Sequence, residues 1–141
     1  MRVRDLMTAT PITVAPESAV VDARHLMATR RFRHLLVVEG ERLVGIVTDR
    51  DIRLNLPSPA TSLSVWELNY LLARLTVRDV MSRSVITIGA DRDAAEAAQI
   101  MVDHKIGALP VLDGERLVGI VTETDFLRAF ALSYAAAGPA R

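Results

Sequence analysis

The chain has 141 residues, half of them apolar, so we expect one domain or two very small ones with a hydrophobic core. It contains no cysteine, which excludes disulfides, thiolate metal sites and cysteine nucleophiles and favours a reducing compartment, predicted to be the cytoplasm. Lysine plus arginine equals aspartate plus glutamate at 17 each, so no global basic charge indicates nucleic acid, and no apolar run reaches the roughly 18 residues of a membrane span.

The sequence contains an internal repeat with an offset of 74 residues. VRDLM at 3–7 returns as VRDVM at 77–81, and GERLVGIVT occurs at both 40–48 and 114–122. Across 3–52 and 77–126, 20 of 50 aligned residues are identical. Two copies are too few for a solenoid, so we expect two motifs packed face to face. The predicted organisation is a first motif over 1–55, a linker over 56–76 and a second motif with a C-terminal helix over 77–141.

Within the first motif, the residue pattern predicts the order β-α-β-β-α. Residues 11–14 (PITV) are expected to form a strand, followed by Ser18 as the N-cap of a helix over 19–29. Two apolar strands, 35–38 and 43–47, are joined by a turn at 39–40, and Thr48 begins the next helix. The second motif repeats this order, with VITI at 85–88 as its first strand, so the fold class is α/β with sheets backed by helices.

The linker and the C-terminal residues each predict a further helix. After a turn-rich stretch over 56–62, Ser64 and Glu67 have the spacing of a capping box, and Trp66 and Tyr70 follow four residues apart. This aromatic pair could be a ligand platform, but we favour a packing helix that joins the two motifs. Residues 126–137 are expected to form an apolar helix that covers the core or forms a subunit interface.

Catalytic patterns are missing from the sequence. The three histidines, His25, His34 and His104, have no helical zinc-ligand spacing. Neither a G-x-S-x-G nucleophile motif nor a Walker-type phosphate loop occurs, and the carboxylates are not paired. We therefore do not expect an enzyme or a metal site.

The most informative segment is GIVTDRD at 45–51, which returns as GIVTETD at 119–125. In each copy a strand containing glycine ends in threonine and an aspartate follows three residues later, at a strand-to-helix junction. Such a junction favours phosphate; the threonine hydroxyl can donate to a phosphate oxygen, and the aspartate can accept from sugar hydroxyls. Gly45 and Gly119 would let a ligand or a neighbouring strand come close. Thr-x-x-Asp also fits a helix cap, so both interpretations remain open.

These motifs in tandem resemble a pair of cystathionine-β-synthase (CBS) domains, known as a Bateman module, of the stand-alone bacterial type named for acetoin utilisation. The resemblance covers about residues 3–54 and 77–128. It implies two motifs packed about a pseudo-twofold axis, with two clefts that bind AMP, ADP or ATP and, in some members, S-adenosylmethionine or NAD. It further implies a homodimer that regulates an unidentified partner protein. Neither a membrane nor a nucleic acid is expected as a binding partner.

The resemblance also assigns roles to residues of this chain. Asp51 and Asp125 would hold ribose hydroxyls, and Thr48 and Thr122 would contact phosphate. The base would touch residues at the first strand of each motif: Thr10, Pro11, Ile12, Ser84, Val85 and Ile86. The other wall would be the start of the next strand: Arg33, His34, Leu35, Ala108, Leu109 and Pro110.

The two copies differ in charge. Residues 3–54 carry eight arginines against seven acids, and 77–128 carry six basic residues against nine acids. Arg30, Arg31, Arg33 and Arg50 correspond to His104, Lys105, Gly107 and Thr124. Because the planar guanidinium suits phosphate, we expect the first cleft to bind phosphates more tightly.

Two other functions compete with the nucleotide sensor. One is a scaffold module whose clefts are vestigial. The other is a single-stranded nucleic-acid binder that uses Arg30–Arg33, although only Phe32 supplies an aromatic ring near that patch.

Overall fold

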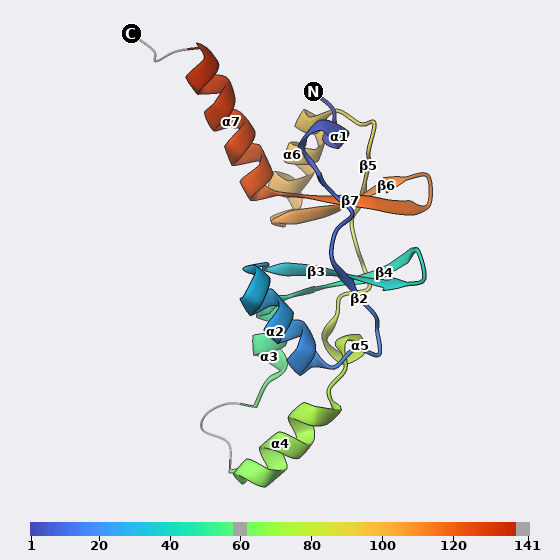
Figure 1. Cartoon of the computed structure of the whole chain (residues 1–141), viewed down its shortest axis with the longest axis vertical. Coiled ribbons are helices and arrows are strands. Elements are labelled where there is room, and N and C mark those ends of the chain that lie inside the picture. The colour runs from blue at the N-terminus through green and yellow to red at the C-terminus, as the bar shows by residue number, and fades with distance from the viewer. Residues whose placement is uncertain (58–61, 138–141) are drawn as a thin grey trace. The chain divides into compact units, whose positions relative to one another are not determined.

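The computed structural model describes residues 1–57 and 62–137, so part of the predicted stretch 56–62 lies outside the described residues. The chain forms two compact units, Ile12–Val85 and Met1–Pro11 with Ile86–Arg141. We call the former the first-repeat unit and the latter the second-repeat unit; both appear in Figure 1. The unit boundaries differ from the repeat boundaries, because the N-terminal residues belong to the unit of the second repeat.

The first-repeat unit contains a three-stranded sheet in the order β2-β3-β4. β2 (Thr13–Val14) is parallel to β3 (His34–Glu39), and β3 is antiparallel to β4 (Arg42–Thr48). Helix α2 (Val20–Arg30) connects β2 to β3, and α3 (Asp49–Asn55) follows β4 directly. Helices α4 (Val65–Arg74) and α5 (Val77–Val80) complete the unit.

The second-repeat unit contains a four-stranded sheet in the order β1-β7-β6-β5. Its core motif is β5 (Ile88–Gly89), α6 (Ala94–His104), β6 (Ala108–Asp113), β7 (Arg116–Thr122) and α7 (Glu123–Ala137). Helix α1 (Val3–Leu6) and strand β1 (Thr8–Ala9) come from the N-terminus. Both motifs therefore have the predicted β-α-β-β-α order and the α/β class is confirmed.

Two local predictions were wrong in detail. The first strand of each motif is shorter than predicted: β2 covers Thr13–Val14 instead of 11–14 and β5 covers Ile88–Gly89 instead of 85–88, because only these residues pair with the next strand. Ser18 is not the N-cap of α2: Ala19 is, and the Ser18 hydroxyl accepts the N–H of Ala15 at 3.1 Å instead. The first N–H of α2, from Val20, donates to the carbonyl of Leu75 at 3.0 Å, so the main chain does the capping here.

The two repeats exchange their N-terminal segments. We call residues 2–9 the first lead-in and residues 76–83 the second lead-in. The first lead-in joins the second-repeat unit: Val3 N–H donates to the Arg92 carbonyl at 2.9 Å, and β1 pairs antiparallel with β7. The second lead-in joins the first-repeat unit: Val77 N–H donates to the Ser18 carbonyl at 2.8 Å. Each motif is therefore completed by a segment that precedes the other motif in the sequence.

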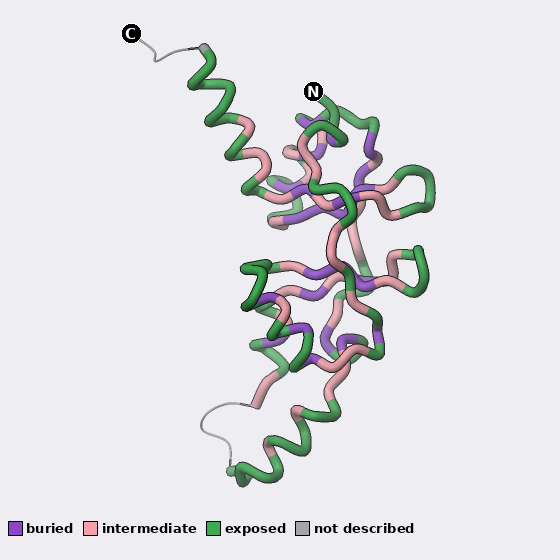
Figure 2. Tube along the Cα trace, in the orientation of Figure 1, coloured by how far each residue is buried: buried purple, intermediate pink, exposed green. Residues whose placement is uncertain are grey.

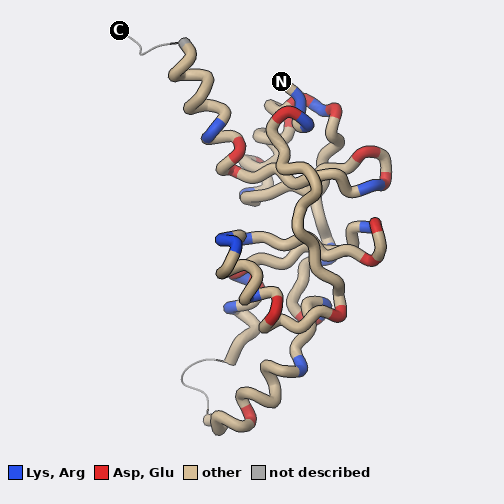
Figure 3. The backbone as a smooth tube through the Cα atoms, in the orientation of Figure 1, with Lys and Arg blue, Asp and Glu red and all other residues tan. Residues whose placement is uncertain are grey.

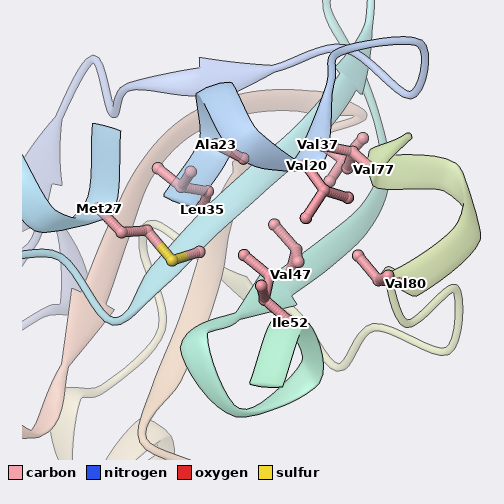
Figure 4. Packing of buried hydrophobic residues seen from close by; sticks show 9 residues of the cluster. All are labelled: Val20, Ala23, Met27, Leu35, Val37, Val47, Ile52, Val77 and Val80. Carbon is pink, nitrogen blue, oxygen red and sulfur yellow. The ribbon is translucent and has the colours of Figure 1, made fainter. Parts of the chain in front are cut away.

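Each unit has its own aliphatic core, and the exchanged valines are part of it. In the first-repeat unit, nine buried side chains point toward one another in Figure 4: Val20, Ala23, Met27, Leu35, Val37, Val47, Ile52, Val77 and Val80. The core of the second-repeat unit consists of Val3, Ile88, Ala90, Ala97, Met101, Leu109, Val111 and Val121. Figure 2 shows the buried residues concentrated on the sheets and on the helices that cover them. Val3 and Val77 are both fully buried.

Gly45 and Gly119 are required where the lead-ins cross the sheets. A Cβ atom at Gly45 would lie 2.8 Å from the Met81 sulfur and 2.9 Å from the Ser82 carbonyl oxygen. At Gly119 it would lie 2.6 Å from the Met7 sulfur and 2.8 Å from the Thr8 carbonyl oxygen. Of the two predicted roles for these glycines, the approach of a neighbouring segment is therefore confirmed.

Corresponding ion pairs tie each lead-in to its host unit. Arg78 donates to Glu17 at 2.8 Å, and the matching Arg4 donates to Asp91 at 3.1 Å. The hydrogen bond from Arg78 lowers the pKa of the exposed Glu17 carboxyl and raises the pKa of Arg78 itself. Because these groups are solvated, the ion pairs orient the lead-ins more than they stabilise them.

Helices α4 and α7 leave large apolar side chains in solvent. No residue of α4 is fully buried and Trp66 is 84% exposed, so only part of the predicted apolar face packs within the unit. The cause is the helix geometry: Leu68, Leu72 and Leu75 form the partly buried side, which leaves Trp66 on the opposite one. In α7, Phe126 packs on the core, whereas Leu127 and Phe130 are exposed. None of the described helices is both long and apolar enough to cross a membrane.

Candidate functional site

The first candidate site is the junction between β4 and α3. Thr48 is the N-cap of α3, and its hydroxyl oxygen accepts the N–H of Asp51 at 3.0 Å. In return, Asp51 Oδ2 accepts the N–H of Thr48 at 2.9 Å. This reciprocal pair is a capping box, so the helix-cap interpretation of Thr-x-x-Asp is confirmed here. It also fixes the carboxylate at the strand end, where Asp51 is half-buried.

The second candidate site, between β7 and α7, has the same residues with different hydrogen bonds. Asp125 Oδ2 accepts the N–H of Thr122 at 2.8 Å, and it also accepts the Thr122 hydroxyl at 3.2 Å. The hydroxyl proton of Thr122 is thus used within the chain, whereas the Thr48 hydroxyl acts as an acceptor toward Asp51. A hydroxyl can do both, so Thr48 retains a proton to donate.

The neighbouring strand brings two more predicted residues to the first junction. His34 lies directly opposite Thr48 in the β3–β4 ladder, and the carbonyl of Arg33 accepts the N–H of Asp49 at 3.1 Å. In the second-repeat unit, Ala108 lies opposite Thr122 and the carbonyl of Gly107 takes the place of Arg33. The predicted start of the second strand therefore does lie beside the Thr/Asp pair in both units.

The charges around the two junctions differ, and Figure 3 shows basic residues gathered between the end of α2 and the start of β3. At the first junction, Asp49 is paired with Arg53 at 3.2 Å, while Arg50 forms no ion pair with any residue in the described ranges. Arg30, Arg31 and Arg33 are likewise exposed and form no ion pair within residues 1–57 and 62–137. The first junction therefore has an excess of positive charge.

The second junction lacks this excess, because Glu123 and Asp125 offset Lys105 and Arg128. Thr124 replaces Arg50, and Glu123 forms no ion pair within residues 1–57 and 62–137. Arg128 approaches Asp125 Oδ1 at 3.8 Å, and the Asp125 side chain is only 10% exposed. At the first junction the residue equivalent to Arg128 is Leu54.

Other predicted site residues lie elsewhere or are turned away. The side chains of Leu35 and Leu109 lie in the two hydrophobic cores, and Ala108 and Pro110 are also buried. At these positions a ligand could contact the main chain but not the side chains. The residues predicted to touch the base are divided between the units. Thr10, Pro11 and Ile86 belong to the second-repeat unit, and Ile12, Ser84 and Val85 to the first-repeat unit.

Sequence reasoning overlooked two features of these junctions. Arg128 is three residues after Asp125, a helical spacing that was available in the sequence. Thr10 has φ of 48°, a left-handed conformation that is unusual for a β-branched residue, and nothing in the residue pattern indicated it. Among the described residues, no three side chains of histidine, cysteine, aspartate or glutamate are grouped as a metal site would require.

Comparisons with known proteins agree with the duplicated architecture. The family model described as "CBS domain" matches residues 3–58 and 77–132. The chain spans 46% and 21% of the length of the first two curated relatives that it matches, at 35% and 37% identity.

Solved structures of similar length give the same fold. A protein described as an acetoin utilization protein (AcuB) from Vibrio cholerae is 30% identical, with a TM-score of 0.79 over 99% of this chain and 98% of that one. The CBS domain pair of protein MJ0100, in complex with 5-methylthioadenosine and S-adenosyl-L-methionine, is 28% identical with a TM-score of 0.77 over 95% and 98%. CBSX2 in complex with AMP is 28% identical with a TM-score of 0.76 over 94% and 97%. With two matched copies that cover most of its length, this chain belongs to the CBS domain family.

Proposed function

We propose that this chain is a regulatory module that binds an adenosine nucleotide and thereby controls a partner protein, without catalysing a reaction itself. The observation that carries the proposal is the repeated Thr/Asp pair at β4–α3 and β7–α7, in a family whose members MJ0100 and CBSX2 were solved with adenosine compounds. AMP, ADP or ATP is the proposed ligand class, with S-adenosylmethionine and NAD as further candidates.

The capping box is compatible with a ligand role. Asp51 Oδ2 is bound to the main chain of Thr48, which holds the carboxylate in one orientation. Its other oxygen, Oδ1, takes part in no hydrogen bond or ion pair inside the described part of the chain, so it is available to accept from ribose hydroxyls. Thr48 would donate its hydroxyl proton to a phosphate oxygen. The same side chains can therefore start the helix and bind a nucleotide.

The differences between the junctions support a preference for phosphate at the first one. There Thr48 keeps a donor proton, Arg50 is unpaired and Asp49 is neutralised by Arg53. At the second junction the Thr122 hydroxyl donates its hydrogen bond to Asp125, and Glu123 has no ion-pair partner among the described residues. We propose that the first junction binds the phosphates more tightly.

The proposed function is tested by thermal unfolding with and without AMP, ATP, NAD and S-adenosylmethionine. A compound present at 100 times its dissociation constant should stabilise the chain by roughly 2.7 kcal/mol. The matched control is the double variant Asp51→Ala/Asp125→Ala, which should show a much smaller shift relative to its own ligand-free form. Wild-type protein that responds to none of these compounds would contradict the proposal and favour the scaffold module.

Arg50→Ala is expected to weaken ATP binding about tenfold, because it removes the unpaired guanidinium next to the Thr/Asp pair. Thr124→Ala, at the equivalent position of the second repeat, should leave the affinity nearly unchanged. Isothermal titration calorimetry measures both variants, with 5-methylthioadenosine as a ligand that has no phosphate and should be insensitive to Arg50. Equal losses from Arg50→Ala and Asp125→Asn would contradict the asymmetry between the repeats.

Control of a partner requires that the ligand favour one arrangement of the protein over another, by no more than its difference in affinity for the two. The partner that we propose first is a second copy of the chain, as a homodimer. A different regulated protein would then recognise the ligand-dependent arrangement.

A further inference from the structure

Helix α4 presents a defined aromatic and cationic surface. Trp66, Tyr70 and Arg74 follow one another at intervals of four residues, so they lie on one side of the helix about 6 Å apart along its axis. Trp66 is 84% and Tyr70 58% exposed. We call these three residues, with Ala73 beside them, the α4 stripe. Figure 2 shows α4 as mostly exposed.

The opposite side of α4 is already used within the chain. Leu68, Leu72 and Leu75 are partly buried there, and α4 lies next to α2 of the same unit. The α4 stripe therefore faces away from the unit to which it belongs. Tryptophan, tyrosine and arginine are the residue types most enriched among energetically important contacts between proteins.

The stripe is complementary to itself. Two copies of α4 running antiparallel about Tyr70 would place Trp66 of each opposite Arg74 of the other, because both residues are four positions from Tyr70. Arg74 already stacks on its own Tyr70, with 4.1 Å between its guanidinium carbon and the ring centre. That contact leaves the other face of the guanidinium plane for Trp66 of a second copy, and tryptophan is the ring that binds cations best.

The charges on the helix agree with the same arrangement. Glu67 is in the first turn of α4 and Arg74 in the last turn. In an antiparallel pair the acidic end of each helix lies beside the basic end of the other, while Ala73 is small enough to let the helices approach. A parallel pair would instead place like charges side by side.

Helix α7 is the other exposed apolar helix, but it specifies a partner less well. Its residues 129–137 contain no charged side chain, and 130–136 are exposed all round. Phe130 and Tyr134 stack on one side of this helix, but without a charged residue that surface does not fix the direction in which a second copy would pack. We infer that copies of this chain associate through antiparallel contact of their α4 stripes, with Arg74 of each copy between its own Tyr70 and Trp66 of the other. The inference rests on the proposed self-association and is independent of nucleotide binding.

Trp66 is the only tryptophan of the chain, so its fluorescence reports directly on the α4 stripe. The surface of one helix is smaller than a stable interface of about 1,200 Å², which places the association in the weak, concentration-dependent class. As the full chain is concentrated from about 1 to several hundred micromolar, sedimentation should show a monomer–dimer transition. The Trp66 emission should shift to shorter wavelength over the same range.

Variants then locate the contact. Tyr70→Ala and Arg74→Gln should each weaken association about tenfold or more, and the emission shift should move to correspondingly higher concentration. The exposed Arg24→Gln on α2 is the matched control and should change neither measurement. Unchanged thermal unfolding of each variant shows that its fold is intact. The double variant Trp66→Arg/Arg74→Trp should regain association in sedimentation that either single substitution loses.

Two results would overturn the inference. The first would also contradict the proposed homodimer, and the second would not. A chain that remains monomeric throughout contradicts both the α4 contact and the homodimer, while its thermal response to nucleotides still tests the ligand proposal separately. A dimer whose Trp66 emission is constant, and which Phe130→Ser dissociates while Arg74→Gln does not, contradicts only the α4 contact and assigns the interface to α7.

Discussion

Val3→Ala is expected to destabilise the second-repeat unit by about 2–3 kcal/mol, although Val3 belongs to the first copy of the repeat in the sequence. The side chain is fully buried in the core formed by β5, β6, β7 and α6. Removing two methyl groups loses about 0.8 kcal/mol each, and the cavity that remains adds to the loss. Denaturant unfolding measures the total effect, and amide hydrogen exchange shows where in the chain it occurs.

Val102→Ala is the matched control, since it makes the same chemical change on the exposed side of α6, where Val102 is 69% exposed. It should be nearly neutral. Val77→Ala should have the mirror-image effect and reduce exchange protection in α2, β3 and β4 of the first-repeat unit. If Val3→Ala reduced protection only in the first-repeat unit, or left stability unchanged, the exchange of lead-ins would be refuted.

Gly119→Ala should cost about 1–3 kcal/mol of stability through steric overlap. Its new Cβ atom would lie 2.8 Å from the carbonyl oxygen of Thr8, a main-chain atom that is held by the pairing of β1 with β7. The Met7 sulfur, 2.6 Å away, could rotate aside, but the carbonyl could move only by displacing β1. Thermal unfolding monitored by circular dichroism is sufficient to measure this loss.

Gly89→Ala tests whether the loss arises from the crossing rather than from glycine replacement as such. A Cβ atom at Gly89 would meet only the Arg92 side chain, at 3.2 Å, and that side chain is flexible and exposed. The variant should therefore stay close to wild type or gain slightly from the better strand propensity of alanine. Equal costs for Gly119→Ala and Gly89→Ala would show that close packing of the lead-in is not what selects glycine.

The repeat and its strand-to-helix junctions were predictable because local patterns determine them. Thr48 and Asp51 are three residues apart at the end of an apolar strand, and this spacing predicts both a helix cap and a place for a ligand. The structure adds a difference that the residue spacing does not predict. The Thr122 hydroxyl donates a hydrogen bond to the Asp125 carboxylate, whereas the Thr48 hydroxyl oxygen accepts one from the Asp51 N–H. Such differences depend on side-chain orientation, which identical residues do not determine.

The exchange of lead-ins was not predictable in this way. β1 has two residues, too few for any periodicity, and its partner β7 is more than 100 positions away in the sequence. Trp66 illustrates the same limit, because an apolar stripe predicts that a helix will be covered without saying by what. Only Gly45 and Gly119 gave a local indication, as glycines inside strands where a side chain would otherwise be favoured.

The reciprocal placement of Val3 and Val77 has a consequence for how such a chain could arise. A polypeptide with a single repeat has one lead-in, and in this arrangement a lead-in packs on the other motif, so two such molecules would have to supply their lead-ins to each other. Gene duplication with fusion turns that bimolecular encounter into a tethered one, at an effective concentration of the order of millimolar. Tandem occurrence then favours folding at low protein concentration, whichever ligand the molecule binds.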